Sequence, residues 1–228
     1  MLNITKNFEL SIILPAYNQE KLLKESIEKI KGVFADTVEL IIVDDGSTDN
    51  TLEVVKELLN VKIIINPHNM GKGYSVKKGM LSAKGKYRIF TDADLPYGVK
   101  GIKKIFEKLK NNYDIAIGQR INPYPQNPTR LFCHKIFNFF VRKYLKIPFK
   151  DTQCGLKGFK ANVAEEVFKN LTINGFAFDI ELLCFALKKG YKICIVEVEQ
   201  LKHNVSTITL KDLFKIFNDV RKIKKIYT

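Results

Sequence analysis

The strongest constraint on the fold is an alternation of short apolar runs with longer helical segments. Runs of strand length lie at residues 10–15, 38–43, 62–65, 88–91 and 114–117. Helical segments lie between them at residues 20–34, 51–59 and 101–109, and a further one ends near residue 83. In the first helical segment, apolar residues recur at intervals of three and four. This β-α-β-α order predicts an α/β fold with a mainly parallel, Rossmann-like sheet, helices on both faces, and ligands at the carboxyl ends of the strands.

Length and composition predict one domain. The chain has 228 residues, 46% of them hydrophobic, and no polar linker divides it. We therefore expect one domain over residues 1–209, followed at 210–228 by a basic amphipathic helix that is not an independent domain. No run approaches the roughly 20 apolar residues of a membrane span, and the N-terminus lacks a signal-peptide core. The four cysteines show no metal-binding spacing and are expected to be reduced, as in the cytosol.

Carboxylates follow the strands. The run 88–91 stops at Asp92 and Asp94, which would share a face if the segment were extended. Two hard oxygen donors suit Mg²⁺ or Mn²⁺ carrying a diphosphate, although aspartates at a strand end are also common turn residues. The run 38–43 also ends in acids, Asp44 and Asp45. The glycine turn at residues 71–73 has the wrong spacing for a Walker loop or a dinucleotide fingerprint.

Several motifs occur in one order along residues 10 to 200. They are Ile13–Glu20 (ILPAYNQE), Val43–Asp49 (VDDGSTD), Asn69–Gly73 (NMGKG), Asp92–Asp94 (DAD), Gly118–Arg120 (GQR) and Asp151–Phe159 (DTQCGLKGF). Together they resemble the family 2 inverting glycosyltransferases of GT-A fold, and more narrowly the dolichyl-phosphate glucose and dolichyl-phosphate mannose synthases.

The resemblance implies a donor site for a nucleotide-sugar. Tyr17 would stack on the base, and Asp45 would accept from a base N–H, which would select uracil or guanine. Asp92 would contact the ribose and the metal, and Asp94 would be a metal ligand and a catalytic residue. Pro96 stands where mannose synthase relatives can offer a glutamine ligand, so water or another residue must fill that position. The implied donor-binding residues are Pro15, Ala16, Tyr17, Glu20, Asp45, Lys72, Asp92 and Ala93.

The second half of the chain is expected to set the acceptor. A polyprenyl phosphate is already an anionic nucleophile and needs cations rather than a base, and by resemblance Arg120 and Arg130 would clamp it. Asp151 and Gln153 are further implied catalytic residues. If the acceptor were instead a sugar hydroxyl, a carboxylate base would be needed, and Asp151, Asp179 and Glu181 are the candidates. His203 falls where some relatives carry a histidine near the diphosphate, but a lone histidine is more often a hydrogen-bonded structural residue. Glu197 replaces a proline of the relatives.

The sequence thus predicts a metal-dependent transfer of a hexose, from UDP-glucose or GDP-mannose, to a polyprenyl (dolichyl) phosphate with inversion. A formal charge of +14 predicts attraction to polyanions. Residues 131–147 and 210–226 each fit a basic amphipathic helix at an anionic membrane surface, or else a core helix with a solvated basic face. We expect peripheral binding on the cytoplasmic face, directly or through a membrane-protein partner. A basic nucleic-acid-binding protein is the alternative of another class; it gives no reason for the carboxylates at the strand ends, so no nucleic-acid partner is expected.

Overall fold

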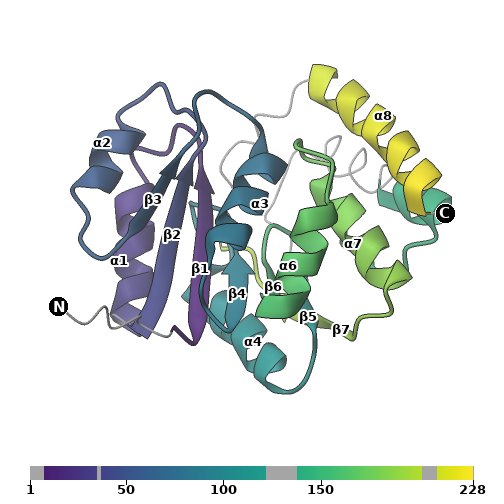
Figure 1. Cartoon of the computed structure of the whole chain (residues 1–228), viewed down its shortest axis with the longest axis horizontal. Helices are drawn as coiled ribbons and strands as arrows, with labels where there is room; N and C mark the ends of the chain where they lie inside the picture. Colours follow the sequence, from purple (N-terminus) through teal and green to yellow (C-terminus); the bar gives the residue numbers. More distant parts are fainter. Residues whose placement is uncertain (1–7, 35–36, 122–137, 202–209, 228) are drawn as a thin grey trace.

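The computed structural model describes residues 8–34, 37–121, 138–201 and 210–227, and the side chains of the last helix from Lys215 onward. These residues form a single α/β unit around a seven-stranded sheet of order β3-β2-β1-β4-β6-β5-β7 (Figure 1). The strands are β1 (Leu10–Ala16), β2 (Val38–Asp44), β3 (Lys62–Ile65), β4 (Tyr87–Phe90), β5 (Ile115–Arg120), β6 (Lys157–Lys160) and β7 (Ile193–Val198). The sheet is parallel except for β6, which runs antiparallel to β4 and β5. The predicted mainly parallel α/β fold is confirmed.

Helices cover both faces of the sheet and divide the core into two layers. One layer holds apolar side chains of α1 (Leu23–Phe34), α2 (Thr51–Lys56) and α4 (Gly98–Lys110). The other layer holds those of α3 (Lys72–Ser82), α6 (Ala161–Asn170), α7 (Phe178–Lys188) and α8 (Leu210–Tyr227), together with helical residues 138–145. Because β1, β2 and β4 carry buried side chains on both faces, their apolar residues follow one another rather than alternate with exposed polar ones. Each strand also buries a polar side chain, Ser11, Glu39 and Arg88 respectively.

The sheet register brings the motifs to one edge. Ala16 at the end of β1 lies opposite Asp44 at the end of β2, and Ile13 lies opposite Phe90 at the end of β4. The chain continues the pairing past both strands, since the Asp45 N–H donates to the Ala16 carbonyl and the Thr91 N–H to the Ile13 carbonyl. The loops that follow β1, β2 and β4 therefore meet at the carboxyl edge, as the sequence predicted.

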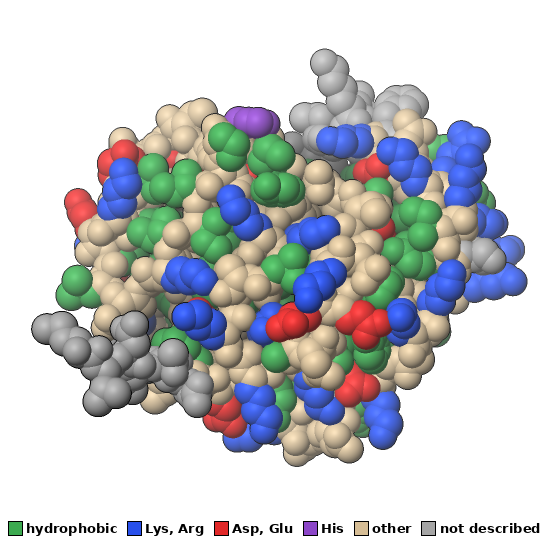
Figure 2. Space-filling model, in the orientation of Figure 1, with side chains coloured by type: hydrophobic (Ala, Val, Ile, Leu, Met, Phe, Trp, Pro, Cys, Tyr) green, Lys and Arg blue, Asp and Glu red, His purple; other side chains and the backbone are tan. Residues whose placement is uncertain are grey.

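The C-terminal helix α8 packs on the domain. Its Ile216, Val220 and Ile223 are buried in the layer that also contains α7. The apolar stripe of α8 is therefore a core face, which is the alternative that the sequence left open, and lysines and arginines gather over its outer side (Figure 2). In the part of the chain that the structure describes, no helix is both long enough and apolar enough to cross a bilayer.

Candidate active site

The loop after β1 is fastened to the loop after β2. The Asn18 N–H donates to Ser47 Oγ, and the Asn18 side-chain oxygen accepts from the Thr48 N–H. Glu20 accepts from the Asn50 N–H at 3.1 Å. Pro15 and Ala16 end the strand beneath this loop, and the Tyr17 side chain is 41% exposed. Glu20 thus shapes the loop, while the Tyr17 ring has an open face on which a planar group can stack.

Asp45 is buried and organises a third loop. Its Oδ1 accepts from the Asn66 side-chain amide at 2.8 Å and from the Met70 N–H at 3.0 Å, and its Oδ2 accepts from the Gly71 N–H at 2.9 Å. Both carboxylate oxygens are therefore engaged by the loop that leads into α3. The role predicted for Asp45, to accept from a base N–H, would require the base to share one of these oxygens.

Lys72 begins α3 and points back to the end of β4. Its Nζ lies 2.5 Å from Asp92 Oδ1. Burial alone would lower the pKa of Lys72, but the charges of Asp92 and Asp179 outweigh it and raise that pKa, so the ammonium stays charged. Two sequence-predicted donor-site residues thus form one half-buried ion pair.

Asp92 is also held against the backbone of Gly155. A Cβ atom on Gly155 would lie 2.2 Å from Asp92 Oδ2, so no other residue fits there without moving that carboxylate. This close approach joins the DAD motif to the DTQCG motif, which is far away in the sequence.

The segment after Asp92 is a turn, which corrects the expectation of an extended segment. Ala93 is buried, Asp94 is half-buried in the turn, the Leu95 N–H donates to the Asp92 carbonyl, and Leu95 has a φ of 47°. Asp92 and Asp94 therefore do not share a face by strand alternation. Pro96 contributes its carbonyl, which accepts from the Leu201 N–H.

The acid pair suits a hard cation that brings its own phosphate ligands. Among the described residues, no group of three or more histidine, cysteine, aspartate or glutamate side chains is placed to hold a metal ion. Mg²⁺ is commonly bound by one or two carboxylates, with substrate phosphates and water completing the shell. The Lys72 ammonium beside Asp92 shows that this position accommodates positive charge.

Arg120 ends β5 and forms a two-pronged ion pair with Asp151. Its Nε and Nη2 each lie 2.7 Å from an oxygen of that carboxylate. Burial would raise the pKa of Asp151, but the hydrogen bonds and charge of Arg120 outweigh it and lower that pKa. Asp151 is thus an ionised partner that orients Arg120, and Nη1 is the prong directed away from the pair.

The turn that carries Asp151 is supported by buried polar groups. Thr152 Oγ1 donates to the Asn138 side-chain oxygen at 3.2 Å, and Gln153 is half-buried. Burial raises the pKa of the Cys154 thiol to about 11. The thiol is therefore protonated near neutral pH and packs in the core. Cys184 and Cys194 are also free thiols, and Cys133 lies outside the described residues.

The other two candidate bases are engaged within the fold. Asp179 Oδ1 lies 2.6 Å from Nζ of Lys157, a lysine with no exposed surface, and burial raises the pKa of Asp179 against the opposing charges of Lys157 and Lys72. Glu181 accepts from the backbone N–H groups of Thr172 and Ile173. Neither carboxylate is placed as an open base.

Sequence reasoning missed Lys157 and Gly155. Both lie inside the DTQCGLKGF motif, and a lysine between the apolar residues Leu156 and Phe159 is the signal that would have singled out Lys157. Its Nζ also donates to the Cys154 carbonyl at 2.6 Å, so one buried ammonium ties the Asp151 turn to α7. Arg130 and His203 lie outside the described residues.

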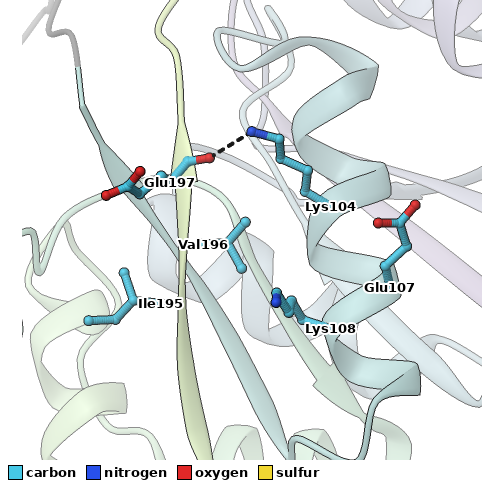
Figure 3. Close-up of a pocket in the computed structure, with 6 residues that line it drawn as sticks. All are labelled: Lys104, Glu107, Lys108, Ile195, Val196 and Glu197. Carbon is cyan, nitrogen blue, oxygen red and sulfur yellow. Dashed lines mark hydrogen bonds between the residues drawn. The ribbon is translucent and has the colours of Figure 1, made fainter.

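A separate hollow lies between α4 and β7, the strand at one edge of the sheet (Figure 3). Its lining includes Lys104, Lys108 and Glu197, and the Lys104 ammonium donates to the Glu197 carbonyl at 3.1 Å. None of the predicted donor or acceptor residues lines it.

The chain resembles known proteins in sequence and in fold. It is 34% identical to a dolichyl-phosphate beta-glucosyltransferase of Dictyostelium discoideum, over 86% of this chain and 67% of the relative. A dolichyl-phosphate beta-glucosyltransferase of Trichomonas vaginalis is 32% identical over 95% of this chain and 73% of its own length. Glucosyl-3-phosphoglycerate synthase from Mycobacterium tuberculosis, solved with uridine diphosphate, shares the GT-A fold with a TM-score of 0.74 at 20% identity, over 96% of this chain and 80% of that one. Residues 11–168 match the sequence profile described as glycosyl transferase family 2, and the chain belongs to that family.

Proposed function

We propose that this protein transfers glucose from a nucleotide-sugar, UDP-glucose first, to a polyprenyl phosphate of the dolichyl type. The curated relatives described above are named for that acceptor and that sugar, and the structural neighbour holds uridine diphosphate. The donor lies at the carboxyl edge, with its base on Tyr17 and its diphosphate near Asp92, Asp94 and Lys72.

The observation that carries the proposal is that three carboxylates are already bound by other groups of the protein. Asp151, Asp179 and Glu181 are the candidates for a base, and each is bound by partners within the fold. A hydroxyl acceptor must lose a proton in the transition state, whereas a phosphate acceptor attacks as an anion. Because each of these three candidates is engaged within the described part of the chain, an arginine held by Asp151 favours the phosphate.

Each group then has a defined task. Arg120, oriented by Asp151, holds the acceptor phosphate so that one oxygen points at the anomeric carbon, on the face opposite the leaving diphosphate. Lys72 balances negative charge beside Asp92. Asp92 and Asp94 would hold a divalent cation, Mg²⁺ or Mn²⁺, which would neutralise the diphosphate as it leaves. The C1–oxygen bond to the diphosphate breaks while a bond to the phosphate oxygen forms, which inverts the configuration.

The test is transfer of radiolabelled glucose from UDP-glucose to a short polyprenyl phosphate, in parallel with the matching polyprenol and with free oligosaccharides. We expect product from the phosphate alone. Robust transfer to an oligosaccharide with none to the phosphate would place the protein among family members with a hydroxyl acceptor. GDP-mannose in the same assay tests the choice of donor.

A further inference from the structure

Two helices that are distant in the sequence form one aromatic and basic surface. Phe139 and Phe140 in residues 138–145 are 58% and 63% exposed, and Phe217 in α8 is 58% exposed. Tyr144 joins the two helices, since the Lys224 ammonium lies 3.7 Å from the centre of its ring. Three large aromatic side chains left in solvent are costly unless something covers them.

The surface uses a flank of α8 rather than its apolar stripe. Ile216, Val220 and Ile223 face the core, whereas Phe217 and Lys224 lie two turns apart on one side of the helix. Because Lys224 contacts Tyr144, this flank is the one that faces residues 138–145. The exposed aromatic side chains of the two helices therefore belong to neighbouring elements.

The charges of the surface are almost all positive. Within residues 138–145 and 215–225 the single acid is Asp219, which is buried. The basic residues of these two stretches are Arg142, Lys143, Lys215, Arg221, Lys222, Lys224 and Lys225. Aromatic side chains rimmed by lysine and arginine match the boundary of an anionic bilayer, where rings sit at the level of the headgroups and cations meet lipid phosphates.

The surface adjoins the candidate acceptor site. Asn138, next to Phe139, accepts from Thr152, and Thr152 follows Asp151, which holds Arg120. We propose that Phe139, Phe140, Tyr144 and Phe217, with their basic rim, dock the protein on an anionic membrane so that the Asp151 turn faces the bilayer. The second half of this statement rests on the proposed lipid-phosphate acceptor; the docking does not.

Flotation with vesicles of equal parts phosphatidylcholine and phosphatidylglycerol tests the docking. We expect the wild-type chain to float with these vesicles and not with phosphatidylcholine alone. The double variant Phe139→Ser, Phe140→Ser should bind roughly tenfold more weakly or worse, because two aromatic rings no longer leave water. Leu59→Ser is the matched control, since Leu59 is 81% exposed after α2, outside this surface, and should leave binding unchanged.

A second pair of variants tests the basic rim. Lys143, Arg221 and Lys225 changed to glutamine should weaken binding roughly tenfold or more. Lys24, Lys56 and Lys100 changed to glutamine remove the same charge elsewhere and should have a much smaller effect. Equal losses of vesicle binding in both triple variants would show that binding depends on net charge alone, and would overturn the proposal of a defined docking surface. Equal flotation of the Phe139, Phe140 variant and the wild type would overturn it as well.

Two readouts separate other outcomes. If the surface instead joins two copies of the chain, size-exclusion chromatography without lipid will show a dimer that the Phe139, Phe140 variant abolishes, and docking is then overturned. Transfer to a short, water-soluble polyprenyl phosphate should be unaffected by this variant. Absence of any transfer by the wild type would count against the proposed function while leaving the flotation result intact.

Discussion

At the scale of single residues, Gly155 tests whether the two central motifs must touch. Gly155→Ala would place a methyl group 2.2 Å from the Asp92 carboxylate, which must then shift. We expect transfer to fall by about a hundredfold or more, since a displacement near 1 Å at a reacting centre has that effect. Gly32→Ala is the control, because a Cβ there meets no atom within 4 Å. Transfer and nucleotide-sugar affinity should be measured for both; wild-type kinetics in Gly155→Ala would contradict the close packing.

Arg120 tests the mode of acceptor binding. Arg120→Lys keeps the charge but loses the planar fork that holds Asp151 at 2.7 Å through two nitrogens. We expect kcat/KM for the polyprenyl phosphate to fall by at least about tenfold, while UDP-glucose affinity by calorimetry stays unchanged. A weakened affinity for UDP-glucose with unaltered acceptor kinetics would move Arg120 to the donor site.

Asp94 tests the cation. Asp94→Asn should abolish transfer, because the amide is a weaker, neutral ligand for the cation. The melting temperature should stay near that of the wild type, since Asp94 is only half-buried and lies in a turn. Adding EDTA to the wild type should give the same loss, reversed by Mg²⁺ or Mn²⁺. Full activity in EDTA would remove the metal from the proposed mechanism.

At the scale of elements, the alternating pattern was enough to predict the first five strands and the helices that lie between them along the chain. The strand at 62–65 and the acids after β2 were located directly, because buried parallel strands are short apolar runs with polar ends. The antiparallel β6 was not predicted. Its sequence, Lys157–Lys160, contains a lysine and a glycine that are explained only by contacts with Asp179 and with α4.

Contacts between distant segments also limit what the sequence can predict about the site. Motifs indicated which residues gather at the edge, but not that Asp45 is bound by its own loop or that Arg120 and Asp151 pair. These contacts depend on side-chain geometry between segments that are about 20 to 30 residues apart.

The buried pair between β6 and α7 provides the prediction for this scale. Asp179→Asn leaves the Lys157 ammonium buried without its carboxylate, which should cost about 3–5 kcal/mol of unfolding free energy. Adding Lys157→Met to that variant should recover part of the loss, since no unpaired charge remains. Chemical denaturation of the two single variants and the double variant measures the coupling. Independent, additive losses would show that the 2.6 Å contact does not couple the two elements.

At the scale of the whole molecule, the C-terminal helix α8 is an integral part of the domain rather than a detachable tail. Its Ile216, Val220 and Ile223 complete the core layer, and the Tyr227 hydroxyl donates to Glu181 at 3.4 Å. Glu181 in turn holds Thr172 and Ile173, and the following residue, Asn174, accepts from the Tyr74 N–H in α3. The helix is thereby linked, through α7 and one loop, to the element that begins with Lys72.

Truncation before Leu210 should therefore destabilise the entire domain rather than only release it from lipid. The truncation removes three buried aliphatic side chains and exposes the core layer beneath them, and each burial is worth roughly 1.5–3 kcal/mol, which is a large part of the stability of a domain this size. We expect a marked drop in melting temperature, or aggregation on expression. The control is the full chain with Lys215, Lys222 and Lys225 changed to glutamine, all three exposed, which should melt within a few degrees of the wild type because exposed charges contribute little to stability. A truncated chain that melts like the wild type would show α8 to be an appended segment, and the core layer that contains α7 would then have to be complete without it.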